Sequence, residues 1–219
     1  MDTELDETEV RVLGCLIEKD LATPEYYPLT LNALVNACNQ KSNRDPLLNL
    51  EVEDVTAALA SLRFKQLALL SAEGGRVAKY RHTIAERLRL SPAELSILGE
   101  LLLRGPQTTG ELRARAERMH PFADLVAVEE ALQELMERTP PLVTRLPRQP
   151  GRKEQRCAHL FAGVPKPADE GRYATPESGR IRTAEGNERI ATLEKEIASL
   201  RTEMEELRQK VDEFIARFE

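Results

Sequence analysis

The apolar residues of two separate stretches recur at helical spacing, and the two stretches match each other. They are LDETEVRVLGCLIEK (residues 5–19) and LSPAELSILGELLLR (residues 90–104). In each, the second residue can cap a helix and a glutamate follows three positions later, namely Asp6 with Glu9 and Ser91 with Glu94. In this capping-box spacing the two side chains satisfy backbone N–H groups that a helix start leaves free. Two equivalent helices are therefore predicted, each with a Leu-Gly pair.

The correspondence continues along the chain. PLTLNAL (28–34) matches PQTTGEL (106–112), and VTAALASL (55–62) matches VEEALQEL (128–135). Each half then has an apolar run, a glycine-containing turn (Gly74-Gly75 or Pro150-Gly151) and a mixed polar run, which is the pattern of a β-hairpin. The residues of the two third helices predicted to face the core are Val52, Val55, Leu59, Leu62, Val128, Leu132 and Leu135.

This order of three helices and a hairpin is that of the winged helix-turn-helix, in which a two-stranded wing closes a three-helix core. The sequence therefore predicts a mainly α fold with small β-hairpins, in the α+β class. Two tandem winged helix-turn-helix domains are expected, at residues 1–88 and 89–163.

The C-terminal part of the chain has a different pattern. Residues 164–188 are rich in Pro, Gly, Ser and charge and lack an apolar period, so we expect a flexible linker. In residues 189–219 the apolar spacing alternates between three and four, which indicates a coiled-coil helix. The seam expected to join two parallel chains consists of Ile190, Leu193, Ile197, Leu200, Met204, Leu207, Val211 and Phe214. The alternative is that this helix folds back onto its own domain.

Composition narrows the class of protein. Hydrophobic residues make up 41% of the chain, which is enough for a core, and the net charge is −6. The acidic N-terminus does not resemble a signal peptide, and the apolar runs are too short to cross a bilayer, so a cytoplasmic protein without a membrane partner is expected. Cys15, Cys38 and Cys157 form no C-x-x-C pair and fit a reducing compartment, with Cys15 and Cys38 as small core side chains.

Candidate catalytic and metal-binding residues are few. The sequence has no phosphate-binding glycine loop and no nucleophile motif, and Glu18 with Asp20 resembles an ordinary charged helix end more than an acid/base pair. Cys157 and His159 could share one side of a strand, but two potential ligands without further partners make a weak zinc case. We therefore expect no enzymatic activity, no cofactor and no metal.

The distribution of charge bears on nucleic-acid binding. Residues 1–88 carry 14 acids and 10 bases, and residues 89–163 carry 10 and 11, so any affinity for DNA has to come from local patches. Acids at the start of the third helices would meet a phosphate-lined groove with like charge. They are Glu51, Glu53, Asp54, Asp124, Glu129 and Glu130. Cations of the predicted wings suit phosphate or the minor groove, or simply form a solvated face. They are Arg76, Lys79, Arg81, Arg145, Arg148, Arg152, Lys153 and Arg156.

The polar stretch NACNQKSNRDP (residues 36–46) lies between the second and third predicted helices of the first half, where a surface loop is expected. Part of it suits turns, and Asn49 can cap the next helix. Its amides and cations exceed what a turn requires, and they are candidate donors to phosphate or to a protein backbone. These candidates are Asn39, Gln40, Lys41, Asn43 and Arg44.

Several of these stretches resemble the YceH-like bacterial proteins, a family of unknown function. The resemblance covers residues 5–163 and rests on LGCLIEK, TPEYYPLTLNALVNACNQKSNRDP, YRH, LLLRGPQTTGELRARAERM and QPGRKEQRCAHLFAG. It implies a tandem winged-helix architecture, and it supplies no activity and no catalytic residues.

Two functions fit this sequence. The first is a non-enzymatic, dimeric tandem winged-helix protein that binds double-stranded DNA or regulates transcription through its wings and the Asn-rich loop. The alternative is a protein-interaction or scaffold module whose acidic third helices contact a partner. Charge reversal at Lys153 and Arg156 separates them, because only the first would lose DNA retention. The sequence shows no dedicated pocket for a small-molecule effector.

Overall fold

The computed structural model describes residues 4–71, 77–148 and 154–164. Predictions about Arg76, Arg152, Lys153, the two hairpin turns, the linker from residue 165 and the heptad helix lie outside this part. The described residues belong to one compact unit and contain seven α-helices, one short 3₁₀ helix and two small antiparallel sheets. The fold is therefore mixed α/β, with helices predominating.

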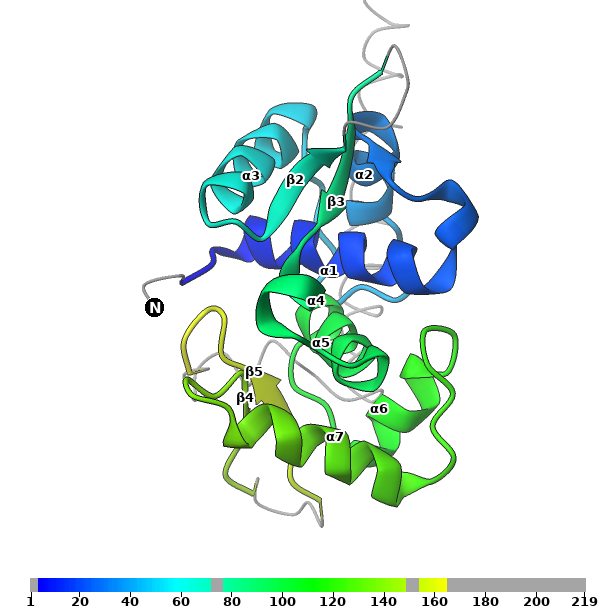
Figure 1. Ribbon diagram of the computed structural model, residues 1–219, viewed down its shortest axis with the longest axis vertical. Helices are drawn as coiled ribbons and strands as arrows, with labels where there is room; N and C mark the ends of the chain where they lie inside the picture. The colour runs from blue at the N-terminus through cyan, green and yellow to red at the C-terminus, as the bar shows by residue number, and fades with distance from the viewer. Residues whose placement is uncertain (1–3, 72–76, 149–153, 165–219) are drawn as a thin grey trace, which may run out of the picture. The chain divides into compact units, whose positions relative to one another are not determined.

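The first half has its elements in the predicted order (Figure 1). They are α1 (Glu7–Ala22), η1 (Pro24–Tyr26), β1 (Leu29–Thr30), α2 (Leu31–Cys38), α3 (Val52–Phe64), β2 (Ala68–Ser71), β3 (Lys79–His82) and α4 (Ile84–Leu88). In the sheet, β1 and β2 both pair antiparallel with β3, which lies between them. Neither β1 nor α4 is predicted from the sequence, because each is too short to show a periodic pattern.

The second half repeats this arrangement with α5 (Pro92–Arg104), α6 (Thr109–Ala116), α7 (Leu125–Glu137), β4 (Val143–Arg145) and β5 (Cys157–His159). Strands β4 and β5 form an antiparallel hairpin, with Thr144 opposite Ala158. Gln107 extends this sheet, because its backbone exchanges hydrogen bonds of 3.0 and 2.8 Å with Cys157. It thus takes the place that β1 has in the first half.

Both predicted capping boxes are present. Asp6 accepts a 2.8 Å hydrogen bond from the Glu9 amide, and the Glu9 carboxylate accepts one of 2.8 Å from the Asp6 amide. Ser91 and Glu94 make the same reciprocal pair at 3.2 and 2.8 Å. Helices α1 and α5 therefore begin where the sequence predicts.

Two details of α3 differ from expectation. The residue preceding the helix is Glu51, whose amide donates to Asp54 Oδ2 at 2.8 Å, so Asn49 is not the cap. Val52 is 41% exposed, because the first turn of α3 extends beyond the core. The other residues predicted to face the core are buried, in α3 and in α7.

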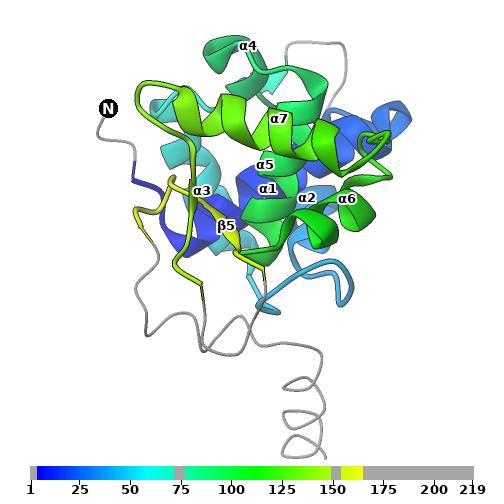
Figure 2. The same cartoon turned by 90° about the horizontal axis from the view of Figure 1, so that it is seen from below.

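Two hydrophobic clusters share one helix. The first cluster contains Leu95, Leu102 and Leu103 of α5 together with residues of α1, α2 and α3. The second contains Ile97, Leu98 and Leu101 of the same helix together with residues of α6 and α7. Helix α5 is buried on both sides as a result, and Figure 2 shows α7 crossing over it.

Helices α1 and α5 approach each other at their glycines. A Cβ added to Gly99 would lie 2.9 Å from Cγ2 of Ile17, and one added to Gly14 would lie 3.1 Å from Cβ of Leu102. Ile17 and Leu102 occupy the same position in the two repeats, so the contacts are reciprocal. Because the glycine of each Leu-Gly pair has no side chain, each helix leaves room for a branched side chain of the other.

The duplication extends to ion pairs. Lys65, directly after α3, lies 2.6 Å from the Glu9 carboxylate, and Arg138, directly after α7, lies 2.7 Å from the Glu94 carboxylate. Each pair connects the end of a third helix to the start of a first helix. No helix in the described part of the chain is long and apolar enough to cross a membrane.

Candidate functional site

A buried ion pair connects the Asn-rich loop to α1. Arg44 is 6% exposed and Glu18 is 1% exposed. Arg44 Nη2 donates to Glu18 Oε2 at 2.6 Å and Nη1 donates to Oε1 at 3.3 Å, while Nε donates to the Ala37 carbonyl at 3.0 Å. A guanidinium placed in this way satisfies a buried carboxylate with two hydrogen bonds. The side chain of Arg44 therefore faces the interior, although a loop this polar predicts exposure.

The same loop also contacts the second half. Arg104 of α5 donates to the side-chain oxygen of Asn43, and Arg118, two residues after α6, donates at 3.2 Å to Glu18 Oε1, the carboxylate that Arg44 binds. The Asp45 amide donates to the Leu103 carbonyl at 3.0 Å. The loop is thus held against α5 as well as against α1.

The other candidate residues of the loop also have hydrogen-bond partners among the described residues, with one exception. The Asn39 side chain donates to the Leu50 carbonyl and accepts from the Leu50 amide, both at 2.8 Å, which closes the loop. Gln40 Oε1 accepts from Arg44 at 3.0 Å. Only Lys41 among the five is exposed to solvent. Most of the loop's candidate binding residues are therefore used in hydrogen bonds within the protein.

Two buried carboxylates in this region have opposite pKa shifts. Burial raises the pKa of Glu18, but the hydrogen bonds and charge of Arg44, followed by Lys19, outweigh burial and hold the pKa below its usual value. Burial also raises the pKa of Glu100, which is 1% exposed, and there it prevails over the charge of Arg104 at 3.3 Å. Glu18 is thus stabilised as a carboxylate, whereas Glu100 is not.

The described wing cations are dispersed. Arg81 pairs with Glu86 at 2.7 Å, and Arg145 pairs with Glu129 of α7. Lys79 on β3 and Arg148 after β4 make no hydrogen bond or ion pair with another described residue, and Arg156 is half-buried. Pairing with acids reduces the charge that Arg81 and Arg145 offer to phosphate.

The outward surface of α3 is apolar at its C-terminal end. We call this surface the α3 face; it consists of Glu53, Ala57, Ala60 and Phe64 at spacings of four, three and four. It lies opposite the buried Val55, Leu59 and Leu62. All four residues are exposed, and Phe64 is 90% exposed. An aromatic side chain this accessible is uncommon on a helix that also has a buried side.

The matching surface of α7 is acidic instead. This α7 face consists of Val126, Glu130, Gln133 and Glu137, all of them exposed. Gln133 donates to Glu137 at 2.6 Å, and Val126 is 61% exposed. Neither face contains a cation, so neither offers a phosphate ligand along its central line.

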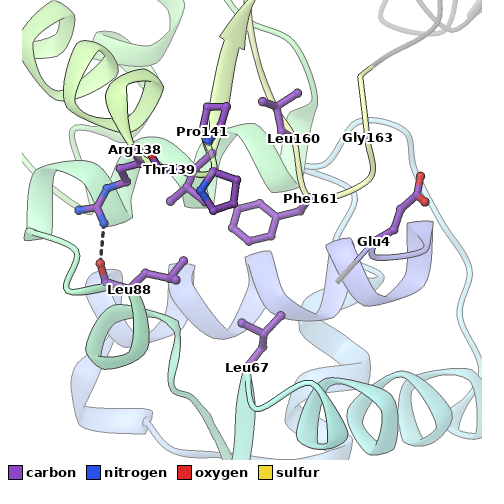
Figure 3. Close-up of a pocket in the computed structure, with 11 residues that line it drawn as sticks. Glu4, Leu67, Leu88, Arg138, Thr139, Pro141, Leu160, Phe161 and Gly163 are labelled. Atoms are coloured by element: carbon purple, nitrogen blue, oxygen red, sulfur yellow. Dashed lines mark hydrogen bonds between the residues drawn. The ribbon is translucent and has the colours of Figure 1, made fainter. Parts of the chain in front are cut away.

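A cavity of about 660 Å³ lies between the two halves (Figure 3). Its apolar lining comes from Leu67 and Leu88 of the first half and from Leu142, Leu160 and Phe161 of the second. Arg138 is at one edge and Glu4 at another, with Thr139 and two prolines completing the wall. Sequence reasoning misses this cavity because its lining comes from segments far apart in the chain.

Cys157 and His159 lie two residues apart on β5 and share one side of the strand, as the sequence suggests. Burial raises the pKa of the Cys157 thiol to about 11, which disfavours the thiolate that metals and electrophiles require. In the part of the chain that the structure describes, no three His, Cys, Asp or Glu side chains gather where they could hold a metal ion.

The features above define a duplicated helix-and-hairpin protein in which the two halves share a central helix pair. A family described as "Protein of unknown function, DUF480" matches residues 5–152, and the chain belongs to this family. The chain is 68% identical over 219 residues to a UPF0502 protein of Geotalea uraniireducens and 65% identical over 219 residues to one of Geobacter sulfurreducens. Each alignment covers 100% of both chains. The prediction that the chain belongs to a family of uncharacterised bacterial proteins is confirmed. The identity of that family with the YceH-like proteins stays a prediction.

Proposed function

We propose that the chain is a non-enzymatic tandem winged-helix protein that binds another protein through the α3 face. The observation that carries this proposal is the exposure of Phe64, at 90%, on a face whose four residues include no cation. In a winged helix the third helix is the element that enters the DNA major groove. Here that helix presents two alanines and a phenylalanine, which gain more from contact with an apolar partner than from a groove lined with phosphate.

Charge indicates the chemistry of the partner. The N-terminal end of α3 adds the exposed carboxylates of Glu51, Glu53 and Asp54 to the apolar end at Phe64. A matching segment would have an apolar side chain over Ala60 and Phe64 and a cation near Glu53. Because Ala57 and Ala60 are small, a helix of the partner can approach closely.

A second candidate function is DNA binding through the wings. The observation in its favour is that Lys79 and Arg148, one on each hairpin, have no partner among the described residues. Both are free to contact phosphate without first breaking an ion pair. The internal contacts of Arg44 and Asn39 favour protein binding over this candidate, because they occupy donors that the loop would need for DNA.

We also propose that two chains associate through the heptad seam of residues 189–219. The support for this is the sequence pattern alone: branched residues such as Ile190 and Ile197 alternate with Leu193 and Leu200, a combination that favours parallel two-stranded coils. Two chains would present two α3 faces, which raises the effective concentration for a partner with two sites.

The test uses the full chain immobilised as bait in a lysate of Geobacter sulfurreducens, with and without nuclease. Protein binding predicts that a retained protein survives nuclease and is lost with Phe64→Glu. A matched control is Leu47→Glu, since Leu47 is another exposed apolar residue, at 62%, and lies outside α3. Retention by the control variant should equal that of the unaltered chain.

The opposite result identifies the DNA function. Retained material that disappears with nuclease, and with Lys153→Glu and Arg156→Glu but not with Phe64→Glu, would replace the proposal. A binding constant that falls steeply with salt would accompany that result, because phosphate contacts release counterions.

A further inference from the structure

The cavity between the halves lies at the bases of both hairpins. Leu67 and Leu142 occupy the same structural position: the Leu67 amide donates to Leu62 and the Leu142 amide donates to Leu135, at 2.8 and 3.0 Å. Each carbonyl then accepts a hydrogen bond from the amide of the residue that directly follows the second strand of its own hairpin. This residue is Thr83 for Leu67 and Leu160 for Leu142. A molecule in the cavity would therefore touch equivalent points of the two repeats.

The walls are held in place by hydrogen bonds. The Arg138 guanidinium donates to the Leu88 carbonyl at 2.5 Å, which ties one edge of the cavity to the first half (Figure 3). The same guanidinium donates to Glu94 of the second half at 2.7 Å. At the other side the Leu5 amide donates to the Phe161 carbonyl at 2.7 Å. The cavity is thus bounded by contacts that cross from one half to the other.

The charge of the lining is one-sided. Arg138 is neutralised by Glu94, and its remaining donors contact backbone carbonyls. The carboxylate of Glu4 makes no hydrogen bond or ion pair with another described residue. Its Oε1 lies beside Gly163, where an added Cβ would come within 3.1 Å of it. The cavity therefore has, at the edge of an apolar space, an exposed carboxylate that no other described residue pairs.

We propose that this cavity binds a small organic cation with an apolar body. The volume of about 660 Å³ lies within the range of small-molecule sites. The apolar part would lie against Leu67, Leu160 and Phe161, and the cationic group would pair with Glu4. Because the ligand contacts both hairpin bases, its binding favours the arrangement of the halves seen here. This site is independent of the partner surface on α3.

The test compares two probes with the same carbon skeleton, 4-phenylbutylamine and 4-phenylbutyrate, by calorimetry on the full chain. The amine is expected to bind at least about tenfold more tightly than the acid. Glu4→Gln should remove this preference. Glu25→Gln is the matched control, since Glu25 is an exposed acid that does not line the cavity, and it should leave the preference unchanged.

Filling the cavity gives a second readout. Leu160→Trp should weaken binding of the amine about tenfold or more. Thr139→Trp, at an exposed lining residue, gives the same information if Leu160→Trp does not fold. Equal binding of the two probes, an unchanged preference in Glu4→Gln, or no binding at millimolar concentration would each overturn the proposal.

Discussion

Arg44 and Glu18 form an ion pair inside the protein, with Nη2 and Oε2 2.6 Å apart and both side chains almost fully buried. The pair joins residues separated by 26 positions in the chain. Arg118 of the second half contacts the same carboxylate. A loop that resembles a binding surface in the sequence is therefore part of the junction between the halves.

This pair predicts a large stability cost when its cation is removed. Arg44→Met leaves the Glu18 carboxylate with less compensation in a buried site, so we expect a loss of about 3–5 kcal/mol in the free energy of unfolding. Lys41→Met, at the exposed position of the same loop, should change it by less than about 0.5 kcal/mol. Urea unfolding followed by circular dichroism measures both. Equal midpoints for the two variants would contradict the internal role of Arg44.

The two buried carboxylates predict opposite effects of Gln substitution. The lowered pKa of Glu18 stabilises the fold above the usual pKa of a glutamate, about 4.3, and this contribution is lost as pH falls through the lowered folded value. Glu18→Gln should therefore be less stable than the unaltered chain at pH 7, and the difference should narrow below about pH 4.

Glu100→Gln should behave differently. The raised pKa of Glu100 means that folding disfavours its ionised form, so removing the charge should increase stability at pH 7. The gain should disappear as pH falls below the usual pKa, where the carboxyl is protonated in both states. Denaturant midpoints of both variants between pH 3 and pH 8 test the signs. A destabilised Glu100→Gln at pH 7 would show that the attraction between Arg104 and this carboxylate outweighs its burial.

The contact between α1 and α5 predicts that Gly99 does not tolerate substitution, whereas Gly110, which lies outside this contact, does. Gly99→Ala would place a Cβ 2.9 Å from Ile17, and overpacking of this kind costs about 1–3 kcal/mol. Gly110→Ala in α6 meets nothing within 4 Å and should be neutral or stabilising by up to about 1 kcal/mol, because alanine favours helix. Thermal unfolding of the two variants is the measurement. A neutral Gly99→Ala would mean that the two helices can move apart freely.

The heptad pattern predicts a dimer, and charged substitutions in its seam should dissociate it. Leu200→Lys together with Leu207→Lys places cations in an apolar seam, so sedimentation should show the mass of one chain, 24.6 kDa, instead of two. Arg201→Gln, outside the seam, should leave the dimer intact. A single-chain mass for the unaltered protein would instead support a helix that folds back onto its own domain.

Local signals account for the predictions that hold. The reciprocal bonds of Asp6 with Glu9 involve residues three apart, so they can be identified from sequence. The buried positions of α3 and α7 follow from spacing alone, and the duplicated order of helices and hairpins follows from matching two stretches of one chain. The domain boundaries at residues 88 and 163 stay predictions.

Features that depend on distant residues could not be predicted. Arg44 is polar and lies in a polar loop, and only the fold brings it to Glu18. Val52 continues the apolar period of α3 but lies beyond the core, since periodicity does not mark where packing ends. The cavity has no sequence signature, because Leu67 and Phe161 belong to different halves. Glu18 itself carried a signal: its place in an otherwise buried helix segment calls for a cation partner.

The shared position of α5 limits how the chain can be divided. A fragment ending at residue 88 would keep α1 but lose the α5 leucines that cover it. A fragment beginning at residue 89 would keep α5 but expose the side of α5 that packs against α1. Each fragment would then have an exposed apolar surface along one helix and would tend to aggregate. Anyone dissecting this protein for biochemistry should keep residues 4–164 in one polypeptide.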